Sequence, residues 1–325
     1  MRRLLARPEF AAVLGVLGVW LFFAVAAGAP FRGAAGAAAY LNAAAPLGIL
    51  SVAVAVLMIG GEFDLSVGSI IGAAGMGFLL LTTHFGWPLW PALGMTLLCC
   101  AAVGFANGLL VVKTGLPSFI ITLGTLFVLR GATIGTSRAL TGRTQLGGLD
   151  AAAGHPLADS LFAGEPMPGF SAAILWWMAL VALATWVLLR TRTGNWIRAA
   201  GGAAEAARNA GVPVECVKVG LFTTTALAAG LVAVIQAVRF NGADALRGEF
   251  QEFRAIVAVV IGGTLLTGGY GSAAGAACGA LLYGMVQQGI VMTGIDADWF
   301  QVFLGAMLVI AVLLNRTLHA RAAEL

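Results

Sequence analysis

The chain has 325 residues, of which 60% are hydrophobic and only 10% are charged, and its mean hydropathy is +0.96. Because about a quarter of the residues of a soluble domain are charged, this composition excludes that class and indicates an integral membrane protein. The net charge of +4 does not point to a nucleic-acid partner, since the basic residues gather in short loops, as the positive-inside rule requires.

The apolar runs predict an all-α fold, a polytopic transmembrane helix bundle in a single domain over residues 1–325. Crossing a bilayer takes about 20 apolar residues as a helix, and the runs lack the alternation of barrel strands. We predict about ten spans of this length, with the third and eighth interrupted by glycine. The predicted spans are residues 10–28, 41–59, 67–83, 89–112, 118–136, 171–189, 219–238, 255–267, 273–293 and 299–314.

The distribution of Arg and Lys predicts the orientation of these spans. Basic residues cluster before the first span, after the sixth and after the tenth, at residues 2–7, 190–218 and 316–321. Ten crossings place all three clusters on one side, so both termini and the 190–218 loop are predicted to be cytoplasmic. The loops 137–170 and 239–254 then lie on the opposite side. The first apolar run is predicted to be a retained helix, because it is longer than the core of a typical signal peptide.

The stretch "MIGGEFDLSVGSIIGAAG", residues 58–75, places Glu62 and Asp64 between glycine pairs in an apolar region. A carboxylate at a helix centre costs about 2.5–3.5 kcal/mol on insertion scales, so these two should have a structural or functional use. Asp64 fits a helix N-cap and also a broken-helix element that lines a passage, and the two interpretations are compatible. Glu62 fits a cytoplasmic-side salt bridge or a subunit contact.

Two segments resemble each other within the chain. "IGGEFDLSVGSIIGAA" (residues 59–74) and "IGGTLLTGGYGSAAGAA" (residues 261–277) share an initial IGG and a later GS and GAA. Chance and a true duplication both remain open in a chain so rich in Gly and Ala. If the duplication is real, matching glycine-interrupted segments point to the translocation site of a transporter.

Further polar residues within or beside the spans have two interpretations. Asn42, Asn107, Gln236, Gln287 and Gln288 either face a polar path or bond across helices, which is the commoner case. Ser118, Thr122 and Thr125 either line the path or bond back to the preceding helical turn. The candidates for the substrate path are Asp64, Ser66, Asn107, Ser118, Thr122, Gln236 and Gln287.

The loop after the sixth span contains a short predicted helix at residues 203–210. Glu205 and Arg208 can pair at i, i+3, and Gly211 and Pro213 end the helix. Such an element is either a docking helix or an ordinary solvated loop helix.

Catalytic and metal-binding motifs are absent from the sequence. A P-loop requires Lys directly after Gly, whereas Lys113 and Lys218 each follow Val. The three histidines and four cysteines lack the spacing of metal ligands or of a disulfide framework. We therefore predict no enzyme activity, no metal and no cofactor.

Four blocks together resemble a known family. They are "GGEFDLSVGS" (60–69), "NGLLVVKTGLPSFIITLGTLFVLRG" (107–131), "GNWIRAAGGAAEAARNAGVPV" (194–214) and "AIVAVVIGGTLLTGGYGS" (255–272). In this order they resemble the monosaccharide-transporting, ribose-type permease subunits of bacterial ABC importers. The resemblance extends over about residues 42–315, nearly the whole chain.

The resemblance implies a subunit of the inner membrane that imports a monosaccharide by alternating access. Its partners would be a second permease copy, a periplasmic sugar-binding protein and a cytoplasmic ATP-binding subunit that carries the missing nucleotide site, all organised around the lipid bilayer. The segment 202–211 would be the coupling loop that seats on the ATP-binding subunit, with Gly202, Glu205, Ala206, Ala207, Arg208 and Gly211 as its residues.

The sequence departs from the family at two places. Ala203 and Ala204 stand where polar residues are common, and Arg254 stands where an acidic residue is common. These departures leave the substrate open, and related permeases carry nucleosides, autoinducer sugars or branched-chain amino acids. An ion-coupled secondary transporter, supported by the internal repeat alone, is the alternative from another class; a membrane scaffold is disfavoured by the polar breaks.

Overall fold

The computed structural model describes residues 8–152, 154–307 and 309. These residues are almost entirely helical, with one two-stranded sheet, which confirms the all-α fold class. The basic clusters at residues 2–7 and 316–321, on which part of the orientation depends, lie outside the described residues. The chain divides into two compact units, while the prediction of a single transmembrane domain stays a prediction.

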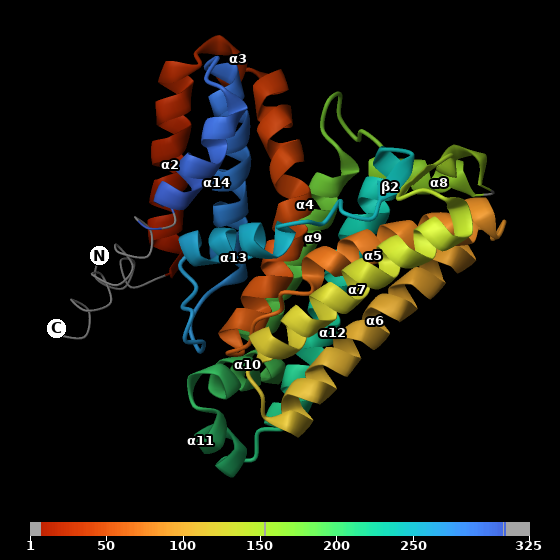
Figure 1. Cartoon of the computed structure of the whole chain (residues 1–325). Helices are drawn as coiled ribbons and strands as arrows, with labels where there is room; N and C mark the ends of the chain where they lie inside the picture. The colour runs from red at the N-terminus through yellow and green to blue at the C-terminus, as the bar shows by residue number, and fades with distance from the viewer. Residues whose placement is uncertain (1–7, 153, 308, 310–325) are drawn as a thin grey trace. The chain divides into compact units, whose positions relative to one another are not determined.

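Unit 1 comprises the chain up to Gly61, residues 167–203 and the chain from Arg254. Helix α4 packs against α14 and α9, and α2 packs against α14, so the first and last parts of the described chain run side by side (Figure 1). Its core holds Phe23, Phe31, Met285 and Ile290. The helices are α2 (Pro8–Ala26), α3 (Ala29–Arg32), α4 (Ala34–Ile59), α9 (Ala172–Arg190), α10 (Arg192–Gly202), α13 (Gln251–Ile261, from Arg254 onward), α14 (Ala273–Met292) and η4 (Ala297–Trp299).

Unit 2 comprises residues 62–166 and 204–253. Helix α12 packs against α6 and α5, and α5 also packs against α7. Gly104 lets α6 approach the backbone of α12, because a Cβ there would lie 2.5 Å from the carbonyl oxygen of Phe222. The elements are α5 (Val67–Leu79), η1 (Leu80–His84), α6 (Leu89–Thr114), α7 (Ser118–Thr141), β1 (Gln145–Gly147), η2 (Leu149–Ala151), α8 (His155–Ala158), η3 (Asp159–Ala163), α11 (Ala204–Asn209), α12 (Val214–Arg239) and β2 (Gly242–Asp244).

Seven helical segments within the described residues are long and apolar enough to cross a membrane. Each contains, or coincides with most of, one predicted span: α4, α5 with η1, α6, α7, α9, α12 and α14. The first predicted span corresponds to α2, whose apolar part, Ala12–Ala26, is shorter. The tenth, 299–314, lies partly outside the described residues.

The predicted span at 255–267 is wrong in extent. Helix α13 ends at Ile261, because Gly263 adopts a left-handed backbone with φ 88° that an α-helix cannot continue. The chain then turns, and α14 begins at Ala273.

The two similar segments share a backbone pattern. In each, a helix ends at Ile, at Ile59 or Ile261, and the second glycine of the following pair is left-handed, with φ 83° at Gly61 and 88° at Gly263. An irregular segment follows in each, and then a new helix begins. We call residues 60–66 the first break and residues 262–272 the second break.

Candidate functional site

Asp64 is the centre of a buried polar network in unit 2. Its side chain is 1% exposed, and its Oδ1 accepts the Ser66 backbone N–H at 2.8 Å and the Ser66 hydroxyl at 2.6 Å. Its Oδ2 accepts the hydroxyl of Thr225, on α12, at 3.3 Å. These donors compensate for the removal of the carboxylate from water.

The predicted helix cap at Asp64 is wrong by two residues. Helix α5 begins at Val67, so the N-cap position belongs to Ser66, whose side chain makes no capping bond. The Ser66 hydroxyl instead donates to Asp64, and the Asp64 carboxylate closes a local turn before the helix. Asp64 therefore shapes the first break rather than the first turn of α5.

Two hydroxyl groups of α7 hold the backbone of the first break. Ser118 Oγ accepts the N–H of Phe63 at 3.1 Å, and Thr122 Oγ1 accepts the N–H of Leu65 at 3.0 Å. Residues four apart on a helix rise by about 6 Å, close to the spacing of alternate residues in extended chain, so the two partners match in register. Thr122 also donates to the carbonyl of Ser118 at 2.9 Å, the back-bonding that the sequence suggested.

Asn107 connects α6 to the same network. Its Nδ2 donates to Ser66 Oγ at 3.0 Å, and its Oδ1 accepts the hydroxyl of Thr125 at 2.6 Å. Asn107 is 1% exposed and Ser66 is fully buried. Three helices, α6, α7 and α12, therefore bind the first break through polar side chains.

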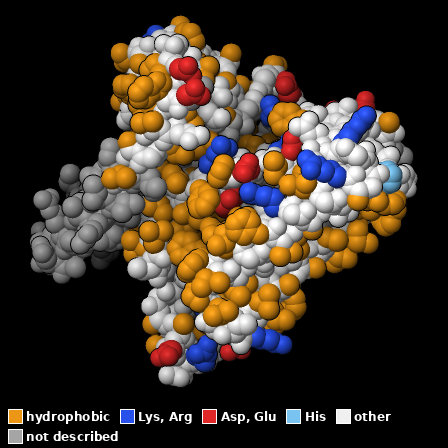
Figure 2. All heavy atoms as spheres, viewed as in Figure 1, with side chains coloured by type: hydrophobic (Ala, Val, Ile, Leu, Met, Phe, Trp, Pro, Cys, Tyr) orange, Lys and Arg blue, Asp and Glu red, His pale blue; other side chains and the backbone are white. Residues whose placement is uncertain are grey.

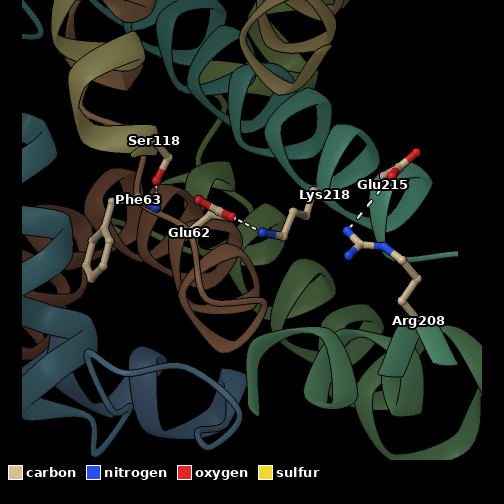
Figure 3. A network of polar contacts seen from close by, with 6 residues as sticks. All are labelled: Glu62, Phe63, Ser118, Arg208, Glu215 and Lys218. Atoms are coloured by element: carbon tan, nitrogen blue, oxygen red, sulfur yellow. Dashed lines mark hydrogen bonds and ion pairs between the residues drawn. The ribbon is translucent and has the colours of Figure 1, made fainter. Parts of the chain in front are cut away.

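Glu62 forms an ion pair with Lys218 of α12 (Figure 3). This is the salt-bridge alternative of the two interpretations, and its cytoplasmic side stays a prediction. The side chains are 9% and 22% exposed, respectively, so the pair is largely shielded from water. One helical turn earlier on α12, Glu215 lies 3.9 Å from Arg208 of α11, and both of these side chains are more than half exposed.

The predicted pairing of Arg208 with Glu205 is therefore corrected. Helix α11 has only six residues, and the turn after it brings the first turn of α12 within reach of Arg208. Arg208 contacts Glu215 of that turn instead.

The segment 202–211 presents a short helix to its surroundings. Gly211 ends it with φ 85°, as predicted, and the side chains of Glu205, Ala206 and Arg208 are exposed, whereas Ala207 is 6% exposed and anchors the helix. Charged side chains gather around α11, and hydrophobic ones spread along the longer helices (Figure 2). This arrangement suits a small docking element attached to an apolar body.

The loops predicted on the opposite side are joined by the β1–β2 sheet. Gln145 pairs with Asp244 and Gly147 with Gly242 in antiparallel register. The Asn241 side chain also accepts the backbone N–H of Asp150 at 2.9 Å. Residues 145–150 and 241–244 of the two loops thus contact each other within unit 2, and the side of the membrane on which they lie stays a prediction.

Metal chemistry finds no support within the described residues. No group of three or more His, Cys, Asp or Glu side chains there could hold a metal ion.

Comparison with known families identifies the protein family to which the chain belongs. Residues 36–312 match the family described as "Branched-chain amino acid transport system / permease component". The chain belongs to this family. The predicted class, a permease subunit of an ABC importer, is thereby confirmed, and the chain is a transport subunit and a multi-pass membrane protein.

The permease is similar to curated relatives over most of its length. It is 29% identical to the xylose transport system permease protein XylH of Escherichia coli K12, covering 96% of this chain and 93% of the relative. It is 32% and 31% identical to the autoinducer 2 import system permease proteins LsrD of Klebsiella pneumoniae and Photorhabdus luminescens, with 82% of this chain covered in each case. No solved structure matches the chain.

The structure brings five of the seven path candidates of the permease into one network: Asp64, Ser66, Asn107, Ser118 and Thr122. Gln236, on α12, is partly exposed, and its buried Oε1 has no partner within the described part of the chain. Gln287, on α14 of unit 1, is partly exposed. The contact of any of the seven with substrate stays a prediction.

Sequence reasoning missed three polar residues around the first break. Thr225 and Lys218 bind it from α12, and Glu252 is 2% exposed against the first turn of α5, where a Cβ on Gly68 would lie 2.1 Å from its Oε2. Lys218 carried a weak signal, because it is one of only two lysines. Thr225 gave none, since a threonine in an apolar helix usually bonds to its own backbone.

Proposed function

We propose that the chain is the membrane-spanning permease subunit of an ABC importer that moves a monosaccharide or a similar hydroxylated solute into the cytoplasm. A periplasmic binding protein would deliver the solute, and ATP-driven motion of a partner subunit would open a path by alternating access. The protein would lie in the bacterial inner membrane with both termini cytoplasmic.

The similarity to the xylose permease carries this proposal, because it extends over 96% of this chain and 93% of the relative. The LsrD relatives, named for autoinducer 2 import, add a second small solute to the same framework. A branched-chain amino acid is the second candidate, because the description of the matching family names that substrate. The xylose and autoinducer 2 relatives favour the sugar-like class.

An ion-coupled secondary transporter is less well supported by the contacts of the two carboxylates. Glu62 is paired with Lys218, and Asp64 accepts bonds from Ser66 and Thr225. A carrier of that class would need an acidic group in the membrane that is available to an ion or a proton. The two carboxylates of the first break already have partners within the chain.

The exposed segment 202–211 is the proposed contact with the cytoplasmic ATP-binding subunit. It combines an anchored alanine, Ala207, with exposed charges at Glu205 and Arg208. The joined loops around the β1–β2 sheet would face the periplasmic binding protein. A second permease copy would complete the path.

The docking proposal is tested by two charge variants of the assembled transporter. Arg208→Glu reverses the charge on the exposed face of α11, whereas Glu215→Gln removes the partner of Arg208 but leaves that face unchanged. We expect Arg208→Glu to reduce co-purification of the ATP-binding subunit and transport-coupled ATP hydrolysis, and Glu215→Gln to retain both. Normal assembly and coupling in Arg208→Glu would contradict the assignment.

The substrate class is tested by uptake of radiolabelled xylose into vesicles that contain the complete transporter. Unlabelled aldoses should compete for the cognate binding protein and reduce uptake, while leucine should not. Uptake of radiolabelled leucine in the same vesicles, with no uptake of xylose, would transfer the assignment to the amino-acid class.

A further inference from the structure

Three segments of unit 1 meet through glycine backbones, with no side chain between them. Gly201 lies at the end of α10, Gly61 lies in the first break, and Gly268 and Gly269 lie in the second. A Cβ on Gly201 would lie 1.9 Å from the carbonyl oxygen of Ile59 and 2.8 Å from the nitrogen of Gly269. We call Gly61, Gly201, Gly268 and Gly269 the glycine junction.

The remaining glycines of the junction also lie in close contact with one another. A Cβ on Gly268 would lie 2.8 Å from the carbonyl oxygen of Gly201 and 2.8 Å from the Cα of Gly61. The Gly269 N–H donates to the carbonyl of Ile59 at 2.8 Å, so the second break is also hydrogen-bonded to the end of α4. All three segments therefore touch one another directly.

The junction differs from the packing of small residues along two helix faces. Three of its glycines are left-handed, with φ 83° at Gly61, 81° at Gly268 and 75° at Gly269. Other L-residues rarely adopt this backbone, so these positions require glycine for conformation as well as for space. The contacts lie at the end of one helix and in two irregular segments, where the backbone can change direction.

Two members of the junction, Gly201 and Gly61, are continuous with parts of the proposed mechanism. Gly201 and Gly202 end α10, and the docking helix α11 starts two residues later, at Ala204. Gly61 directly precedes Glu62, the first residue of the polar attachment in unit 2. Within α10, Arg198 donates to the carbonyl of Leu188 at 2.7 Å, which ties α10 to α9.

We infer that Gly201 is a positioning residue that transmits a displacement of α10 to both breaks, so that the two breaks move together. Helix α10 leads into the docking segment. Protein interiors are close-packed and transmit displacement, and backbone contacts offer no flexible side chain to absorb it. A shift of the end of α10 is therefore passed to residues 59–61 and 268–269. This inference rests on the proposed docking of segment 202–211.

Gly201→Ala and Gly18→Ala form a matched pair of tests on the assembled transporter. Both glycines lie in helices of unit 1, but a Cβ on Gly18, in α2, would have no atom within 4 Å. We expect Gly201→Ala to lower uptake about tenfold while the ATP-binding subunit still co-purifies, a size typical of coupling between sites. Gly18→Ala should keep uptake near that of the unchanged protein.

The outcomes separate this inference from the docking proposal. Loss of uptake in Gly201→Ala with retained assembly and retained ATP hydrolysis supports the junction as a coupling contact. Equal uptake in the two alanine variants overturns it. Loss of docking itself is tested separately by Arg208→Glu, in which we expect less of the ATP-binding subunit to co-purify.

A measurement on the unchanged transporter keeps the inference testable if Gly201→Ala does not fold. Amide hydrogen exchange is compared with and without a non-hydrolysable ATP analogue, which binds the partner subunit. We expect the exchange of residues 199–203, 59–61 and 268–270 to change together, with the Gly269 amide as the most direct reporter. A change in either break without a change at residues 199–203, or no change at all three, overturns the inference.

Discussion

The first and second breaks both follow an Ile-Gly-Gly end of a helix, yet they are held in different ways. In the first, side chains from three helices bind the segment: Ser118 and Thr122 accept its N–H groups, Asn107 bonds Ser66, and Lys218 pairs with Glu62. In the second, backbone groups bond to one another, for example Leu265 N–H to the carbonyl of Tyr270 at 3.1 Å and Gly269 N–H to that of Ile59.

This difference determines which substitutions each break should tolerate. A buried polar network is costly when one partner is removed, because the other partner keeps its desolvation cost. A backbone contact between glycines carries no such cost, but it is sensitive to any added volume. The first break should therefore respond to changes of charge and hydrogen bonding, and the second to changes of size.

The largest expected effect is that of Lys218→Met. The Glu62 side chain is only 9% exposed, so it would stay buried without a counter-charge, and breaking a buried pair in this way costs about 3 kcal/mol of unfolding free energy. Glu62→Gln should cost only about 1 kcal/mol, because the more exposed Lys218 can turn toward water. Thermal unfolding of the purified permease in detergent measures both effects. A larger loss of stability in Glu62→Gln than in Lys218→Met would contradict the expected order.

A smaller effect is expected from Thr122→Val. The substitution keeps the shape of the side chain but removes the acceptor of the Leu65 N–H, at a cost of about 1–2 kcal/mol. Thr223→Val is the control, because that hydroxyl bonds to the carbonyl of Val219 in its own helix. Equal unfolding midpoints for the two variants would mean that the Thr122 hydroxyl does not hold the first break.

The smallest effect, of opposite sign, is expected in the second break. Thr264 is 1% exposed, and its hydroxyl oxygen is without a hydrogen-bond partner among the residues that the structure describes. Thr264→Val replaces this hydroxyl with a methyl group, which should leave the unfolding midpoint unchanged or raise it. A loss as large as that of Thr122→Val would show that polar side chains hold both breaks alike.

The sequence predicted the helical class and most spans, because long apolar runs indicate burial in a bilayer directly. It placed seven spans close to observed helices but extended the eighth past Ile261, since hydropathy does not register the left-handed backbone of Gly263. The same limit explains why the cap at Asp64 was misplaced. At the start of α5, Ser66 makes a local bond with Asp64 and a tertiary one with Asn107, and residue spacing could not show the tertiary bond.

The candidate site was predicted in part for a similar reason. Asp64 and Asn107 stood out because polar groups are rare in apolar runs, and the structure joins them through Ser66. Thr225 and the Arg208–Glu215 contact arise from the packing of helices distant in sequence or from a turn, so residue spacing could not show them. The glycine junction was hidden by the abundance of glycine, 45 residues in the chain.

Uptake by the reconstituted transporter tests the central claim, that this subunit moves solute only when a partner hydrolyses ATP. Proteoliposomes would contain the permease with its ATP-binding subunit, with the loaded binding protein outside. We expect uptake that requires ATP on the side of the ATP-binding subunit and persists after ion gradients are collapsed. Uptake by the permease alone, driven by an ion gradient without the ATP-binding subunit, would contradict it.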